Sequence, residues 1–198
     1  MSKIKSTILL WLSITSSLLV LLLQLVQWKL VEIFTPFVMP VVYLAVYGFF
    51  LVVLIMALID LIRRRNWKAT GVQAAAIVLL FIVPFNQIVL EMDFNMNNSE
   101  RLEVVAQVQD GSFQPNVVHN SSLIRLPEEY SSLSNGGGEI KVEKDRDDYS
   151  VLFFTFRGIL DGFSGFVYSN EKPETDAFGG DIKEIEKMDE DWYFVTSY

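Results

Sequence analysis

The sequence predicts a membrane α-helical fold of three transmembrane helices, joined to a small α+β domain in which one helix packs on an antiparallel sheet of about five or six strands. Three observations support this prediction. Apolar runs without charge fill most of the first 90 residues, as membrane-spanning helices require. Four cations interrupt these runs: Arg63, Arg64, Arg65 and Lys68. Beyond residue 117, apolar residues alternate with polar ones, which is the period of strands.

The four cations are predicted to determine the topology. Four charges in six residues cannot lie in hydrocarbon, and the positive-inside bias assigns such a loop to the cytoplasm. Counting crossings outward from this loop leaves the N-terminus inside and the C-terminal domain outside. We therefore expect a multi-pass protein of the plasma (cytoplasmic) membrane, with residues 1–90 as its membrane region.

Two apolar runs precede the cations. The first predicted span, residues 7–27, is uncharged and has the ~20 residues that cross ~30 Å of hydrocarbon. It lacks the short apolar core and small-residue cleavage site of a removed signal peptide, so we interpret it as a retained signal anchor. A short outer turn at 31–35, with Thr35 and Pro36 as a helix start, leads into the second span at about 37–62.

The third predicted span covers residues 70–90. Pro84 should kink or end its helix near the outer leaflet, because proline has no N–H to donate. Small residues recur four positions apart in the first and third spans, and such pairs let helix backbones approach closely: Ser13 with Ser17, and Gly71 with Ala75. We therefore expect these two spans to touch near the cytoplasmic side.

Few polar residues lie within the spans. Asp60, at the inner end of the second span, is expected to pair with Arg63 or Arg64 across one helical turn. Asn86 and Gln87 follow Pro84, and we expect them to satisfy backbone groups that the proline frees or to face the outer domain.

The two halves of the chain differ in charge. Residues 1–90 carry seven Lys/Arg and two Asp/Glu, a net +5, whereas residues 91–198 carry nine and twenty-two, a net −13; together they give −8. The acidic half argues against nucleic acid as a partner, because binding a phosphate backbone needs surplus cations. It also argues against adhesion of that half to anionic lipid head groups.

The chain contains no cysteine. It therefore has no disulfide framework, no thiolate nucleophile and no cysteine metal site. Many bacterial surface domains fold without disulfides, so we expect a protein of a bacterial cell envelope.

Residues 91–98 are polar and asparagine-rich, and we expect them to form a tether to a domain at 99–198. Ser99 as a helix start and Gly111 as a stop predict an amphipathic helix over 99–110. Alternating apolar residues between turn signals predict six strands: 117–126, 139–144, 150–157, 165–169, 182–188 and 192–197. The third of these is apolar on both faces, as expected of a central strand.

Arg157 and Asp161 flank a turn within the most aromatic stretch of the chain, residues 153–168. One interpretation is a ligand or partner site, in which the two charges lie in an apolar cleft with Phe163 and Phe166. The alternative is a salt bridge that closes the turn, with the aromatic side chains in the core. The sequence leaves both interpretations open.

The remaining polar groups do not predict a catalytic residue, a cofactor site or a metal site. His119 is the only histidine, so neither a zinc site nor a triad with Ser121 and Ser122 is expected. The glycine run 136–138 is expected to be a loop. Two acidic turns could offer oxygens to Ca²⁺, but neither alternates acids around a glycine as an EF-hand does: Asp145, Asp147 and Asp148, and Asp189, Glu190 and Asp191.

These observations favour a non-enzymatic membrane protein whose partners are the lipid bilayer and another protein, at the outer surface or within the membrane. Immunity to a secreted toxin, an accessory role in secretion or transport, and envelope sensing fit equally well. The alternative is an oligomeric small transporter or channel subunit, gated by the outer domain, with Asn86 and Gln87 lining a path. An enzyme would require Arg157, Asp161 and a further carboxylate to converge on a pocket.

Overall fold

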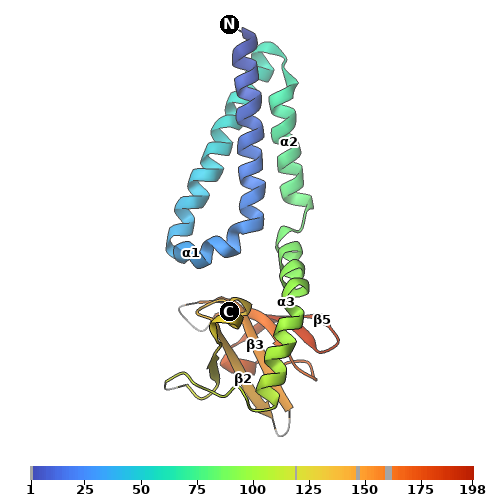
Figure 1. Ribbon diagram of the computed structural model, residues 1–198. Coiled ribbons are helices and arrows are strands. Elements are labelled where there is room, and N and C mark those ends of the chain that lie inside the picture. Colours follow the sequence, from blue (N-terminus) through green and yellow to red (C-terminus); the bar gives the residue numbers. More distant parts are fainter. Residues whose placement is uncertain (1, 119, 146–147, 159–161) are drawn as a thin grey trace. The chain divides into compact units, whose positions relative to one another are not determined.

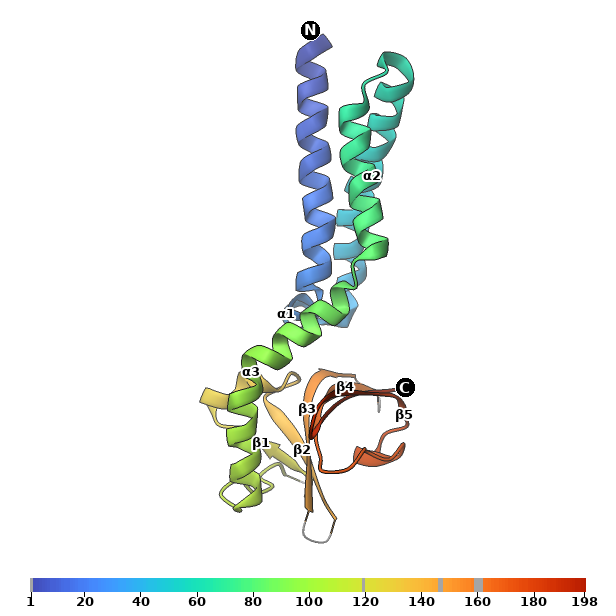
Figure 2. The same ribbon diagram turned by 90° about the vertical axis from the view of Figure 1, so that its right-hand side faces the viewer.

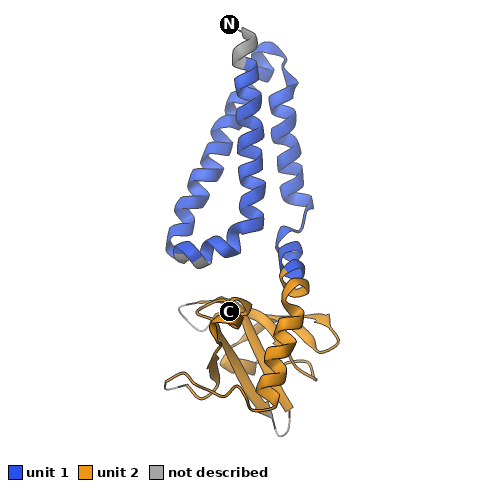
Figure 3. Ribbon diagram, in the orientation of Figure 1, with its two compact units in different colours: residues 1–92 blue, residues 93–198 orange. Residues whose placement is uncertain are grey.

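The computed structural model describes residues 2–118, 120–145, 148–158 and 162–198. The chain divides into two compact units, Met1–Met92 and Asp93–Tyr198 (Figure 3). The first unit is helical and the second combines one helical segment with an antiparallel sheet.

The first unit begins with the helix α1, Ser2–Arg64, which folds into two arms (Figure 1). Each arm contains a stretch long and apolar enough to cross a membrane, Ser6–Val31 and Phe37–Arg64, and these stretches include the first two predicted spans. Residues 31–35, expected to form a turn, keep helical backbone as the chain reverses. Pro36 and Pro40 lie in this region, and each lacks the N–H of a regular helix, which favours the change of direction.

The third predicted span is divided in two. The helix α2, Trp67–Ile82, and the helix α3, Phe85–Gln109, meet at an angle of 61° across a break at Val83 and Pro84. The predicted effect of Pro84 is therefore confirmed. Within the described residues, two helical stretches are long and apolar enough to cross a membrane, or three if the bent pair counts as one span.

The first arm of α1 packs against α2, but not through the predicted pairs. Ser13 and Ser17 are buried as expected, whereas Gly71 and Ala75 are exposed. The face of α2 that packs inward consists of Ala69, Gln73 and Ala76. The prediction for Gly71 and Ala75 was therefore wrong. An amide facing hydrocarbon is costly, and turning Gln73 inward sets the rotation of α2.

The helix α3 is longer than the helix predicted at 99–110. Residues 91–98, expected to be a tether, are helical, because no proline or glycine interrupts residues 85–110 and the side chains support one another across turns. The Asn97 side chain donates to Asp93 Oδ1 at 2.8 Å, four residues earlier. Gly111, with φ +81°, follows the end of α3 as the sequence predicts.

Six strands form one antiparallel sheet in the order β1-β2-β3-β4-β6-β5, and Figure 2 shows that it is strongly curved. All six predicted strands are present: β1 Leu123–Arg125, β2 Glu139–Asp145, β3 Asp148–Arg157, β4 Phe163–Tyr168, β5 Ile182–Asp189 and β6 Trp192–Ser197. Two short 3₁₀ helices, η1 Glu128–Leu133 and η2 Ala177–Gly179, lie between them.

The strand β1 is much shorter than the predicted 117–126. The Asn116 side chain accepts from Arg125 N at 2.7 Å and donates to Arg125 O at 3.0 Å, and Asn116 N donates to Leu123 O at 3.3 Å. This amide therefore covers the open edge of β1. An edge strand covered in this way cannot pair with another chain at those groups.

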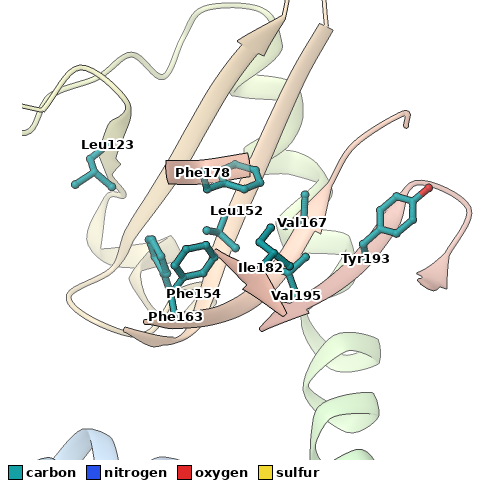
Figure 4. Packing of buried hydrophobic residues seen from close by; sticks show 9 residues of the cluster. All are labelled: Leu123, Leu152, Phe154, Phe163, Val167, Phe178, Ile182, Tyr193 and Val195. Carbon is teal, nitrogen blue, oxygen red and sulfur yellow. The ribbon is translucent and has the colours of Figure 1, made fainter. Parts of the chain in front are cut away.

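Both faces of the sheet are apolar, which explains the apolar character of residues 150–157. One face packs under α3 through Phe153, Phe166 and Trp192, with Phe94 of α3 against the last two rings. The opposite face forms a second core in which the ring of Phe178 from η2 lies by Leu152 and the rings of Phe154 and Phe163 meet (Figure 4). The prediction of one helix packed on an antiparallel sheet is thus confirmed in its layout.

Candidate functional site

The side chain of Arg157, at the end of β3, pairs with a carboxylate that the sequence did not single out. Its guanidinium lies 2.7 Å from Glu139 Oε2 and 5.2 Å from the ring centre of Phe154. The side chain remains 37% exposed. Asp161, the predicted partner of Arg157, lies outside the described residues.

Glu139 lies between two arginines. Arg125 is its cross-strand neighbour in β1, and the Arg125 guanidinium lies 2.7 Å from Glu139 Oε1. Burial acts to raise the pKa of Glu139, but hydrogen bonds and charge from Arg157 and Arg125 outweigh burial and hold the pKa below its ordinary value. Glu139 is therefore an ionised, paired carboxylate, which is unsuited to act as a general acid near neutral pH.

The segment before β2 positions this arginine–glutamate–arginine group. Ser134 Oγ donates to the carbonyl of Glu139 and accepts from Phe154 N at 2.9 Å, while Asn135 N donates to Phe154 O at 2.6 Å. These bonds hold the 134–135 segment against β3. Gly136 has φ +83°, and a Cβ there would lie 3.0 Å from Arg157 Cβ, so glycine is required where the loop crosses Arg157.

Phe163 and Phe166 lie on opposite faces of the sheet. Phe163 belongs to the core in Figure 4, where its ring meets Phe154 edge-on at 6.0 Å between ring centres. The Phe166 ring is fully buried under α3, 5.5 Å from Phe94. The structure therefore does not bring these two rings and Arg157 into one cleft. Of the three, Arg157 alone has a substantial exposed surface.

Arg101 on α3 is the largest fully buried side chain among the described residues, and the sequence reasoning missed it. Its Nη2 lies 2.7 Å from Asp93 Oδ2 and its guanidinium carbon lies 4.4 Å from the ring centre of Phe166. It also donates to the carbonyl of Leu133 at 3.4 Å. Burial lowers the pKa of Arg101 and the Asp93 charge acts to raise it. The signal in the sequence was an arginine between Phe94, Val104 and Val105 at helical spacing.

A second polar group lies inside the helical unit. Gln73 of α2 donates to Ser16 Oγ at 2.8 Å, and Ser16 in turn donates to the carbonyl of Ser13 at 3.2 Å. Gln73 Oε1 and the hydroxyls of Ser13 and Ser17 are buried and have no hydrogen-bond partner among the described residues. Apolar side chains precede and follow this group along the helices: Leu9, Val53, Ala57 and Ala69, and Val20, Phe50 and Ala76. We refer to Ser13, Ser16, Ser17 and Gln73 as the central polar cluster.

Polar contacts also join the helices at both ends of the first arm. At one end Asn66 donates to Ser6 Oγ at 2.7 Å and to Asp60 Oδ2 at 2.9 Å. Asp60 also pairs with Arg64 at 3.3 Å, which confirms the predicted ion pair. At the other end the Gln27 amide donates to Asn86 Oδ1 at 2.6 Å, so Asn86 contributes to helix packing.

Within the described ranges, no group of three His, Cys, Asp or Glu side chains could hold a metal ion. His119, Asp147 and the side chain of Asp145 lie outside those ranges.

No protein-family model, no curated protein and no solved structure matches this chain.

Proposed function

We propose that this chain is a non-enzymatic integral membrane protein of a bacterial plasma membrane, and that its acidic domain binds a partner outside the cytoplasm. The partner would be a protein, a peptide or an envelope component. Immunity to a secreted toxin, assistance to a secretion or transport complex, and envelope sensing are the roles that fit. Residues 93–198 carry nine Lys/Arg and twenty-one Asp/Glu, a net −12, which favours a partner with a cationic surface.

Two hydrogen bonds, one at each end of the first arm, are the main support for placing the domain outside the cytoplasm. Asn66 contacts Ser6 and Asn86 contacts Gln27, so residues 66–86 run beside residues 6–27 in the same direction. If the first arm crosses the bilayer, residues 66–86 cross it as well, despite the break at Pro84. Residues 69–90 contain no charge, which is compatible with a third crossing. Three crossings would leave Arg63–Lys68 and the C-terminal domain on opposite sides.

A pair of reporter fusions tests the topology. A reporter fused after Tyr198 should behave as extracytoplasmic, and the same reporter fused after Asn66 should behave as cytoplasmic. Protease added to whole cells should digest the domain. A cytoplasmic reporter at Tyr198 would contradict the third crossing and the proposed function with it.

Within the domain, we assign the partner contact to the surface formed by Arg125, in the edge strand β1, and Arg157, at the end of the interior strand β3. Arg125 is 67% exposed, and each guanidinium retains N–H groups beyond those directed at Glu139. Asp161 belongs to the same sequence prediction but lies outside the described residues, and Phe163 and Phe166 are buried on opposite faces of the sheet, so the proposed contact depends on the two arginines. An acidic group of the partner would meet the two arginines, while its cationic surface would meet the rest of the domain.

Photo-crosslinking in intact cells tests this assignment. A photoreactive residue in place of Arg125 should give an adduct with a second protein, and the adduct should disappear when Arg157 is replaced by alanine. Lys187, an exposed residue of β5 at the opposite edge, is the matched control position. Equal crosslinking from Lys187 would contradict a contact at Arg125 and Arg157.

The central polar cluster favours a second candidate, an oligomeric transporter or channel subunit. Unpartnered hydroxyl and amide oxygens inside a membrane bundle are the groups that transported solutes or ions contact. Asn86 and Gln87 would extend this path. Flux through reconstituted vesicles that is lost in Gln73→Leu and Gln87→Leu would support this candidate; no flux in the unmodified protein would contradict it.

A further inference from the structure

The connection between α1 and α2 presents unpaired cations beside exposed apolar side chains. Arg63, Arg65 and Lys68 are exposed, and none has an ion pair or side-chain hydrogen bond among the described residues. Asp60 is the only acid between residues 33 and 90, and it is 11% exposed and engaged by Arg64 and Asn66. The positive charge of this connection is therefore not neutralised by the chain itself.

The connection is also well ordered by hydrogen bonds. Arg65 has φ +52° and donates from its backbone N to Leu61 O at 2.8 Å, which ends α1. Asn66 accepts from Lys68 N at 3.4 Å, and its amide group donates to Ser6 and Asp60. Because only Arg65 and Asn66 separate the two helices, the cations are held within a short, defined stretch.

Apolar side chains flank the cations. Trp67, the first residue of α2, is 71% exposed, and Ile62, in the last turn of α1, is 80% exposed. Both helices are apolar along most of their length near this connection. An exposed tryptophan at such a place is stable at the level of lipid head groups, because the ring is apolar and its N–H is polar. The chain thus combines anchoring in the interface with unpaired positive charge.

We propose that this connection binds the head group of an anionic phospholipid through Arg63, Arg65 and Lys68, with Trp67 lying at the level of the neighbouring head groups. Guanidinium and ammonium groups donate to phosphate oxygens, and juxtamembrane cations attract anionic lipids. This proposal does not depend on the partner of the soluble domain or on which leaflet the connection faces.

Spin-labelled lipids test the proposal on the full chain reconstituted in phosphatidylcholine vesicles. The protein should restrict labelled phosphatidylglycerol in preference to labelled phosphatidylcholine. Each of Arg63→Gln, Arg65→Gln and Lys68→Gln should lower this preference about fivefold, the equivalent of ~1 kcal/mol. Arg65→Lys, which keeps the charge, should retain most of it. If Arg65→Gln fails to fold, Lys68→Gln in the first turn of α2 provides an independent measurement.

Lys29→Gln is the matched control, since it removes one exposed cation from the other end of the first arm. Its lipid preference should equal that of the unmodified protein. An equal loss in Lys29→Gln would mean attraction by total charge and would overturn the proposal. So would an unchanged preference when all three cations are replaced, or displacement of the lipid by inorganic phosphate, which would mean a site for the free anion.

Discussion

Both units of this protein bury polar side chains, but they use different chemistry. The helical unit buries neutral amides and hydroxyls in the central polar cluster, and its ion pair of Asp60 with Arg64 lies at a helix end. The sheet unit buries a guanidinium, Arg101, between an aromatic ring and Asp93. A charge deep in hydrocarbon has little to replace its hydration, whereas a folded domain can surround it with a carboxylate, a carbonyl and a π face. The contrast predicts that removing the partner of a buried polar side chain lowers stability more in the sheet unit than in the helical unit.

The largest effect is expected for Asp93→Ala, which leaves the buried Arg101 charge without its carboxylate. We expect the sheet unit to lose about 2–3 kcal/mol, below the range for a fully buried pair because the Asp93 side chain is 40% exposed. Hydrogen exchange of the sheet amides in the full chain measures this loss of stability. The double variant Asp93→Ala with Arg101→Met should recover part of the loss; no recovery would mean that Asp93 acts through another contact.

A smaller effect is expected for Ser16→Ala in the helical unit. This change removes the acceptor of the Gln73 amide and leaves the whole carboxamide unpaired, so we expect a loss of about 1–2 kcal/mol. Gln73→Leu removes the unpaired oxygen together with the amide and should stay within about 1 kcal/mol of the unmodified protein. Unfolding in detergent measures both. A Gln73→Leu variant less stable than Ser16→Ala would contradict this order.

The arginine–glutamate–arginine group around Glu139 should make the stability of the sheet unit depend on pH. Because the pKa of Glu139 is lowered in the folded protein, its contribution is present above the ordinary carboxyl pKa and is lost as pH falls through the folded value. Glu139→Gln should remove this dependence and cost about 1 kcal/mol at neutral pH, since both arginines are partly exposed. Thermal unfolding of both proteins between neutral and acid pH measures the difference, and parallel curves would contradict it.

The smallest effect is expected for Tyr43→Phe. Tyr43 OH donates to Gln27 Oε1 at 3.1 Å, while its ring is retained in the variant. Hydrogen bonds between membrane helices contribute about 0.6 kcal/mol on average, so we expect a loss near that value in detergent unfolding. A loss larger than that of Ser16→Ala would show that the end contacts, and not the central polar cluster, hold the helices together.

Ion pairs between residues close in the sequence could be predicted, whereas ion pairs between distant residues could not. The ion pair of Asp60 with Arg64 was predicted because its partners are four residues apart on one helix. The contacts of Arg157 with Glu139 and of Arg125 with Glu139 join residues 18 and 14 positions apart. They depend on which strands pair and in which register, which no local pattern specifies. Phe163 and Phe166 lie on opposite faces of the sheet for a related reason, because three residues along a strand reverse the face.

The sequence by itself determined the position of the apolar spans, the cationic connection, the break at Pro84 and the six strands. Each of these depends on the length, charge or period of a short run of residues, so it can be recognised locally. Only the tertiary structure decided that α2 turns Gln73 inward, that α3 continues through residues 91–98, and that Arg101 of α3 is buried against the sheet. Those outcomes depend on which surfaces leave the solvent together, and the free energy of that burial is shared among residues far apart in the chain.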